Sequence, residues 1–164
     1  MATLWRMRRG VCGNREALTR VHPSMSAVEL TEKTFDEAVT DNNIVLVDWW
    51  AAWCGPCKQF GPIFEEAATR HTDVVFGKVD TEAQQGLASG AQITSIPTIM
   101  AFREGILVFA QPGALPAPAL ESLLTQVKEL DMDDVRAAMA KQEQAEQEQA
   151  ELAQADAGGE RGTS

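Results

Sequence analysis

Cysteine is scarce in this sequence, tyrosine is missing, and basic side chains are outnumbered by acidic ones. Three cysteines, a small and odd number, do not make the disulfide framework of a small secreted scaffold. No apolar run is long enough to span a membrane, and no apolar region follows the N-terminal arginines as a secretory signal requires. The net charge of −10 argues against a nucleic-acid partner, because phosphates bind clustered Lys and Arg. We therefore expect a cytoplasmic protein that binds neither membranes nor nucleic acids.

The two ends of the chain differ in charge from its middle. Residues 1–24 contain five arginines and one glutamate and show no apolar period. We expect them to be a disordered extension, with Met25 a candidate for the true start of translation; a basic targeting arm is the alternative. Residues 131–164, with nine acidic and three basic side chains, predict an acidic helix to about residue 150 that frays into disorder. The folded domain is expected to span residues 25–130, a length sufficient for one apolar core.

The middle of the chain carries the apolar patterns of strands and helices. A short first strand is predicted over residues 28–30, and apolar runs rich in β-branched residues predict buried strands over residues 44–47 and 74–79. Two more apolar runs, joined across Gly105, predict an antiparallel hairpin over residues 98–102 and 106–110. Helical spacing predicts helices over residues 34–40 and 83–89, and after Pro56 and Pro118. Thr34 and Glu37 have the spacing of a capping box at the start of the first helix.

This order of elements combines crossover units with a hairpin. Crossovers produce parallel neighbours and a hairpin produces antiparallel ones, so the sheet must be mixed. We predict an α/β fold with a central mixed sheet of four to five strands, helices on both faces, and an extra C-terminal helix.

Cys54 and Cys57 form the one C-x-x-C pair, directly after a buried strand and at the start of a helix. The free N–H groups of a first helical turn favour a thiolate, which is the form that attacks disulfides. Cys57, three residues on, is close enough to close a small disulfide, with Gly55 and Pro56 fixing the turn. The pair therefore predicts thiol–disulfide exchange, in which Cys54 attacks and Cys57 resolves.

A structural zinc site is the alternative interpretation of the two cysteines. Such sites take four Cys or His ligands, and no second C-x-x-C is present. The remaining thiol and imidazoles are those of Cys12, His22 and His71. We expect no metal.

Two further segments suggest a site around the cysteines. Asp48 ends an apolar run and should be buried. Burial raises the pKa of a carboxyl group toward neutrality, which would let Asp48 exchange a proton with Cys57. The alternative is that the Asp48 side chain turns outward at the strand end. Pro97 opens a strand, either after an ordinary turn or through a cis Ile96–Pro97 bond that brings the strand start close to the cysteines.

At these residues the sequence resembles the thioredoxin family over about residues 27–130. VLVDWWAAWCGPCK is similar to its active-site segment, SIPTIMAFREG to the strand pair after its cis-proline, GKVDTEAQ to its third strand, and PGA to its substrate-facing loop. The resemblance implies a thioredoxin fold and a protein-disulfide reductase without a bound cofactor, whose redox-active disulfide is Cys54–Cys57. It also implies electrons from NADPH through a thioredoxin reductase, disulfide-containing protein substrates, and a monomer.

The resemblance also implies residue roles. Cys54 matches the family's nucleophile and Cys57 its resolving thiol. Asp48 matches the buried acid, Lys78 the lysine beside that acid, and Pro97 the cis-proline. The substrate-binding surface matches Trp53, Gly55, Pro56, Ile96, Gly113 and Ala114. The chain departs from the family pattern at Trp49, Gln59–Gly61 and Gln111–Pro112, and the last two changes bear on partner choice. A disulfide oxidase or isomerase and a redox-inactive binding module are the competing functions.

Overall fold

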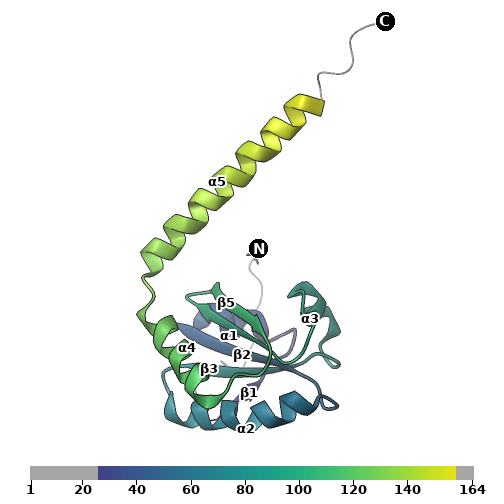
Figure 1. Cartoon of the computed structure of the whole chain (residues 1–164), viewed down its shortest axis with the longest axis vertical. Helices are drawn as coiled ribbons and strands as arrows, with labels where there is room; N and C mark the ends of the chain where they lie inside the picture. The colour runs from purple at the N-terminus through teal and green to yellow at the C-terminus, as the bar shows by residue number, and fades with distance from the viewer. Residues whose placement is uncertain (1–25, 158–164) are drawn as a thin grey trace, which may run out of the picture. The chain divides into compact units, whose positions relative to one another are not determined.

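Five strands form one mixed sheet in the order β1-β3-β2-β4-β5 (Figure 1). The computed structural model describes residues 26–157. The strands are β1 Val28–Glu29, β2 Ile44–Trp50, β3 Val75–Asp80, β4 Thr98–Arg103 and β5 Ile106–Pro112. β3 lies parallel to both β1 and β2, whereas β4 is antiparallel to β2 and β5 is antiparallel to β4. The predicted mixed sheet and hairpin are therefore confirmed.

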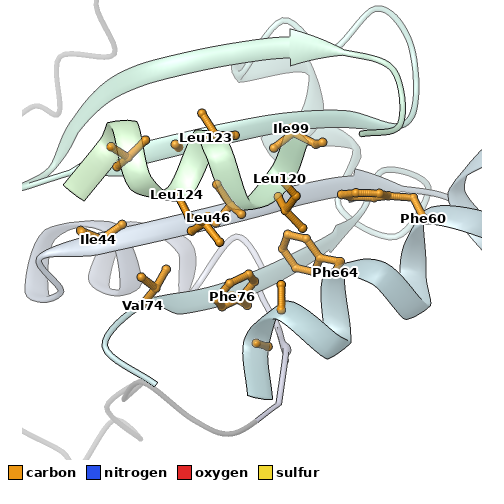
Figure 2. Close-up of a cluster of buried hydrophobic side chains, with 14 residues drawn as sticks. Ile44, Leu46, Phe60, Phe64, Val74, Phe76, Ile99, Leu120, Leu123 and Leu124 are labelled. Atoms are coloured by element: carbon orange, nitrogen blue, oxygen red, sulfur yellow. The ribbon is translucent and has the colours of Figure 1, made fainter. Parts of the chain in front are cut away.

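Helices cover both faces of this sheet, and the sheet separates the apolar core into two clusters. On one face lie α2 (Gly55–Arg70) and α4 (Ala117–Glu129), and on the other lie α1 (Phe35–Asp41) and α3 (Gln85–Gly90). The α2–α4 cluster contains Phe60 and Phe64 of α2 and Leu120 and Leu124 of α4 (Figure 2). These apolar residues recur at helical spacing, so each helix buries one stripe against the sheet.

β2 is the central strand and fixes which residues face α2. Its residues alternate between the two clusters, with Leu46 in the α2–α4 cluster and Val47 and Trp49 in the α1–α3 cluster. Asp48 pairs with Ile99 of β4, which belongs to the α2–α4 cluster. Register partners share a face, so the Asp48 side chain points to the face that α2 covers.

The predicted capping box of α1 is wrong. Thr34 forms no side-chain bond to the helix start, and its backbone is already helical at φ −109° and ψ −14°. Its hydroxyl oxygen accepts instead from the N–H of Thr31 at 3.0 Å. The carbonyl of Thr31 also accepts from the N–H of Thr34 and of Phe35. A turn before the helix therefore takes up the hydroxyl that the capping box would need.

The described residues from Glu129 onward belong to a second compact unit of the chain. Within it α5 runs over Met132–Ala157, past the predicted end near residue 150. Asp131 caps the helix, because its carboxylate accepts from the N–H of Asp133 at 2.9 Å and of Asp134 at 3.3 Å. No helix in residues 26–157 has both the length and the apolar character needed to cross a bilayer. The predicted disorder of residues 1–24, the start at Met25 and the frayed end at 158–164 lie outside the described residues.

Candidate active site

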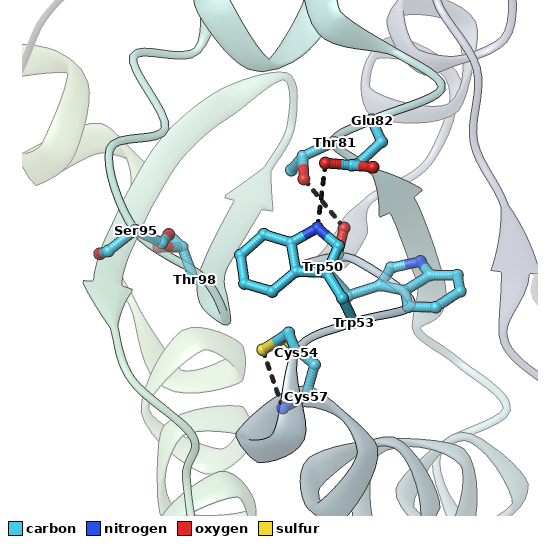
Figure 3. Close-up of a disulfide and its surroundings, with 8 residues drawn as sticks. All are labelled: Trp50, Trp53, Cys54, Cys57, Thr81, Glu82, Ser95 and Thr98. Carbon is cyan, nitrogen blue, oxygen red and sulfur yellow. Dashed lines mark hydrogen bonds between the residues drawn. A yellow bond between two sulfur atoms is a disulfide. The ribbon is translucent and has the colours of Figure 1, made fainter.

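Cys54 and Cys57 form a disulfide at the N-terminus of α2, with their Cα atoms 5.3 Å apart (Figure 3). Cys54 is the residue that caps the helix, and its Sγ accepts from the N–H of Cys57 at 3.2 Å. Pro56 lies in the first turn, where the missing N–H costs no helical hydrogen bond. Both cysteines are buried, with 3% and 4% of their surfaces exposed. The helix start therefore provides a donor to Sγ of Cys54, as the sequence predicts.

Trp53 is the large apolar residue that stands out at the surface beside this disulfide. It is 67% exposed, and its indole N–H donates to Oε1 of Glu82 at 2.9 Å (Figure 3). The carbonyl of Trp50 accepts from the N–H and hydroxyl of Thr81 at 2.9 and 3.1 Å. The segment after β3 thus holds both tryptophans. Glu82 was not predicted, because an acidic residue in a polar loop gives no signal of a distant indole partner.

Asp48, near the C-terminal end of β2, is buried, with 1% of its surface exposed. Neither carboxylate oxygen has a hydrogen-bond partner among the described residues. Burial without partners raises the pKa of Asp48 from 3.8 to about 7, and the positive charge of Lys78 opposes part of that rise. The side chain faces α2, the helix that carries Cys57. The outward orientation considered as an alternative is therefore wrong.

Lys78 is the register partner of Asp48 on β3. Its ammonium lies 3.2 Å from Oε1 of Glu65 and 5.1 Å from the centre of the Trp50 ring. An ammonium over an aromatic face is attracted to it. Glu65, on α2, was also not predicted, because only the packing of α2 on β3 brings it to Lys78. Lys78 therefore interacts with three groups around the site rather than with Asp48 alone.

Pro97 and Gly113 bring two loops together at the same end of the sheet. The Ile96–Pro97 bond is cis, as predicted. The carbonyl of Pro97 accepts from the N–H of Gly113 at 2.8 Å, and Gly113 has a φ of +104°, which only glycine adopts readily. Ile96 is half-buried, and the other predicted substrate-binding residues are exposed: Trp53, Gly55, Pro56, Gly113 and Ala114. Between residues 26 and 157, no three His, Cys, Asp or Glu side chains gather closely enough to hold a metal ion.

The comparisons with known proteins agree with this geometry. A family model described as thioredoxin matches residues 26–129. The putative thioredoxin 2 of Streptomyces coelicolor is 60% identical over 118 residues, which are 72% of this chain and 88% of that protein. The thioredoxin of Mycobacterium tuberculosis is 38% identical over 104 residues, 62% of this chain and 90% of that protein.

Solved structures give the same result. A mutant thioredoxin from Halobacterium salinarum has a TM-score of 0.62 at 32% identity, and the match covers 67% of this chain and 96% of that one. The thioredoxin of Plasmodium falciparum has a TM-score of 0.57 at 34% identity, and the match covers 61% of this chain and 97% of that one. The family match over residues 26–129, joined to a cysteine pair at a helix start, shows that this chain belongs to the thioredoxin family of disulfide oxidoreductases.

Proposed function

We propose that the chain is a monomeric cytoplasmic reductase of protein disulfides, recharged by a thioredoxin reductase with electrons from NADPH. The observation that carries the proposal is a redox-capable cysteine pair at a helix start, placed beside exposed apolar residues on which another protein can dock. Helix N-termini stabilise thiolates, so the attacking form of Cys54 is favoured once the pair is reduced.

The reaction transfers two electrons in two exchanges. The Cys54 thiolate attacks one sulfur of the substrate disulfide, which forms a mixed disulfide and releases the other substrate sulfur as a thiolate. The Cys57 thiolate then attacks Sγ of Cys54 and releases the second substrate thiolate. The Cys54–Cys57 disulfide forms as the substrate disulfide is reduced, and the substrate thiolates take protons from solvent. Two electrons from NADPH, delivered by the reductase, restore the dithiol.

Asp48 is the group we propose as the proton acceptor for Cys57. A base is most useful when its pKa lies near the working pH, and the pKa of Asp48 is about 7. Its side chain faces α2, the helix on which Cys57 lies. Lys78 is proposed as a positioning residue, because its charge lowers the pKa that burial raises. Loss of either group should slow resolution more than the first attack.

The substrate surface is proposed to be the exposed rim around the pair. The bond from Gly113 to the carbonyl of Pro97 supports this assignment, because it holds both substrate-facing loops at one end of the sheet. Trp53, Gly55 and Pro56 would complete the rim on the helix side, and Ile96 and Ala114 on the loop side. A substrate chain lying across the rim would present its cystine sulfur to Cys54.

The test is reduction of insulin disulfides with NADPH and a thioredoxin reductase. Cys54→Ser should lose all turnover, whereas Cys12→Ser, the matched control at the third cysteine, should keep the rate of the native chain. Activity that survives Cys54→Ser would instead favour a binding module. Turnover with dithiothreitol but not with NADPH and reductase would refute the proposed electron source. Sedimentation equilibrium checks the monomer, and fluorescence microscopy of the tagged full chain checks the location.

A further inference from the structure

A groove lined by uncharged, mainly apolar residues lies beside β5 on the face of the sheet that α1 and α3 cover. Its volume is about 560 Å³, within the range of sites that hold ligands. Its lining includes the apolar residues Phe35, Ile93, Met100, Phe102, Leu107 and Pro112. The polar residues Gln92, Thr94 and Gln111 also line it. Although the chain has a net charge of −10, no lining residue is charged. The groove therefore suits an uncharged, mainly apolar group.

The groove opens at an edge of the sheet. β5 ends the strand order of the described residues, so its outer edge pairs with no other described strand. Leu107 is half-buried, and Ala110 and Pro112 are exposed. Ala110 is the register partner of Met100, so the two residues lie on the same face, inside the groove. A chain lying along β5 could therefore insert a side chain between the strand and the segment that joins α3 to β4.

The groove is continuous with the candidate active site. Its lining includes Ser95 and Thr98, which flank Ile96 and Pro97, and Pro112, which precedes Gly113 (Figure 3 shows Ser95 and Thr98). From this end it follows β4 toward Phe102, four residues further on. At about 3.3 Å per residue, that is roughly 13 Å of extended chain. A polypeptide held at the active site can thus reach the groove within a few residues.

We propose that this groove binds an apolar side chain of the substrate polypeptide, a few residues from the cysteine that Cys54 attacks. The inference rests on the proposed function and adds a specificity site to it. Pro112 has no N–H, so a substrate strand cannot pair continuously along this edge of the sheet. Recognition therefore depends on the inserted side chain, with Leu, Met or Phe favoured over a polar residue.

The first experiment compares peptides that differ at one position. Each peptide carries one cysteine as a mixed disulfide with glutathione and has Leu or Ser at the second to sixth position on either side. The rate of glutathione release by the reduced protein is measured under single-turnover conditions. At the spacing that reaches the groove, the Leu peptide should react about tenfold faster than the Ser peptide. Equal rates at all spacings would overturn the inference.

A charged residue placed in the groove should remove this preference. Ala110→Arg is expected to react equally with Leu and Ser peptides, whereas Gln126→Arg, which adds the same charge on α4, should keep the tenfold ratio. Both variants should reduce dithiobis(nitrobenzoate), a small disulfide that cannot reach the groove, within twofold of the native rate. Loss of that basal reduction in the native chain would refute the proposed function itself. A ratio that persists in Ala110→Arg would refute only the groove.

Methyl NMR gives a readout that needs no catalysis. The Met100 methyl signal of the oxidised native protein should shift when the Leu peptide, with its cysteine replaced by serine, is added, and the Ser peptide should leave it in place. No shift with the Leu peptide would overturn the inference. A Met100 shift on deletion of residues 1–24, or on dilution of the protein alone, would show instead that the chain's own extension or a second copy occupies the groove.

Discussion

Replacing Asp48 by alanine should stabilise the protein, and the gain should depend on pH. The side chain is buried, its oxygens have no hydrogen-bond partner among the described residues, and its pKa rises from 3.8 to about 7. At about 1.4 kcal/mol per pKa unit, the ionised carboxylate costs the native state about 4 kcal/mol near pH 8. Asp48→Ala removes that cost but leaves a small cavity, so we expect a net gain of about 2 to 4 kcal/mol at pH 8.

The sign of the pH dependence follows from the raised pKa. Between pH 3.8 and about 7 the native state binds more protons at Asp48 than the unfolded state does, so its unfavourable contribution grows as pH rises through this window. The free-energy difference between variant and native protein should therefore shrink by about 2.5 kcal/mol from pH 8 to pH 5. Urea unfolding of both oxidised proteins at the two pH values, followed by tryptophan fluorescence, measures it.

A control with the opposite sign is available in Asp73. Its hydrogen bond to Lys128 lowers the pKa of its carboxyl, so its stabilising effect is present above pH 3.8 and is lost as pH falls through the lowered value. Asp73→Ala should therefore destabilise the protein, and less so in acid. If the gain from Asp48→Ala were independent of pH, or larger at pH 5 than at pH 8, the Asp48 carboxyl would not be the uncompensated buried acid that we infer.

Three further predictions concern the site and the ends of the chain. In the reduced protein, iodoacetamide should alkylate Cys54 about tenfold faster than Cys57 near neutral pH, because the helix start stabilises the Cys54 thiolate; equal labelling, read by peptide mass spectrometry, would refute the role assignment. Lys78→Met should raise the pKa of Asp48 above about 7 and move the pH–rate profile of the resolving step to higher pH; an unmoved profile would show that Lys78 does not act on this carboxyl. Deleting residues 1–24, which have no apolar stripe to bury, should change neither the melting temperature nor the insulin reduction rate, and a loss of stability would reveal a docking contact.

The strands were largely predictable because burial on two faces leaves a strong signal. The apolar, β-branched run at residues 44–47 is typical of a buried central strand, but the end of that strand was missed. The strand continues through Asp48 to Trp50, and the candidate active site follows its C-terminal end. A carboxylate inside a buried strand breaks the apolar pattern by which strands are recognised. The predicted capping box was wrong for a different reason, since the hydroxyl oxygen of Thr34 accepts a hydrogen bond from the N–H of Thr31.

The chemistry of the site was predictable where it depends on neighbours in sequence. Cys54, Cys57 and Pro56 lie within one helical turn, so their arrangement follows from local rules. Glu82 and Glu65 were missed because they reach Trp53 and Lys78 only through the packing of distant segments. The groove beside β5 was missed too, since its lining comes from α1, from the end of α3 and the segment after it, and from the hairpin. No local sequence pattern predicts a surface that several separate elements form together.

The division of the core by the sheet also bears on how this chain can change by mutation. Phe64 and Leu124 lie in one cluster, and Val39 and Phe102 lie in the other. Substitutions that share no contact have nearly additive effects on the free energy of unfolding. Paired changes across the sheet should therefore add, whereas pairs within one cluster should couple. Substitutions on the α1–α3 face, where the proposed groove lies, can thus accumulate without compensating changes in the α2–α4 cluster.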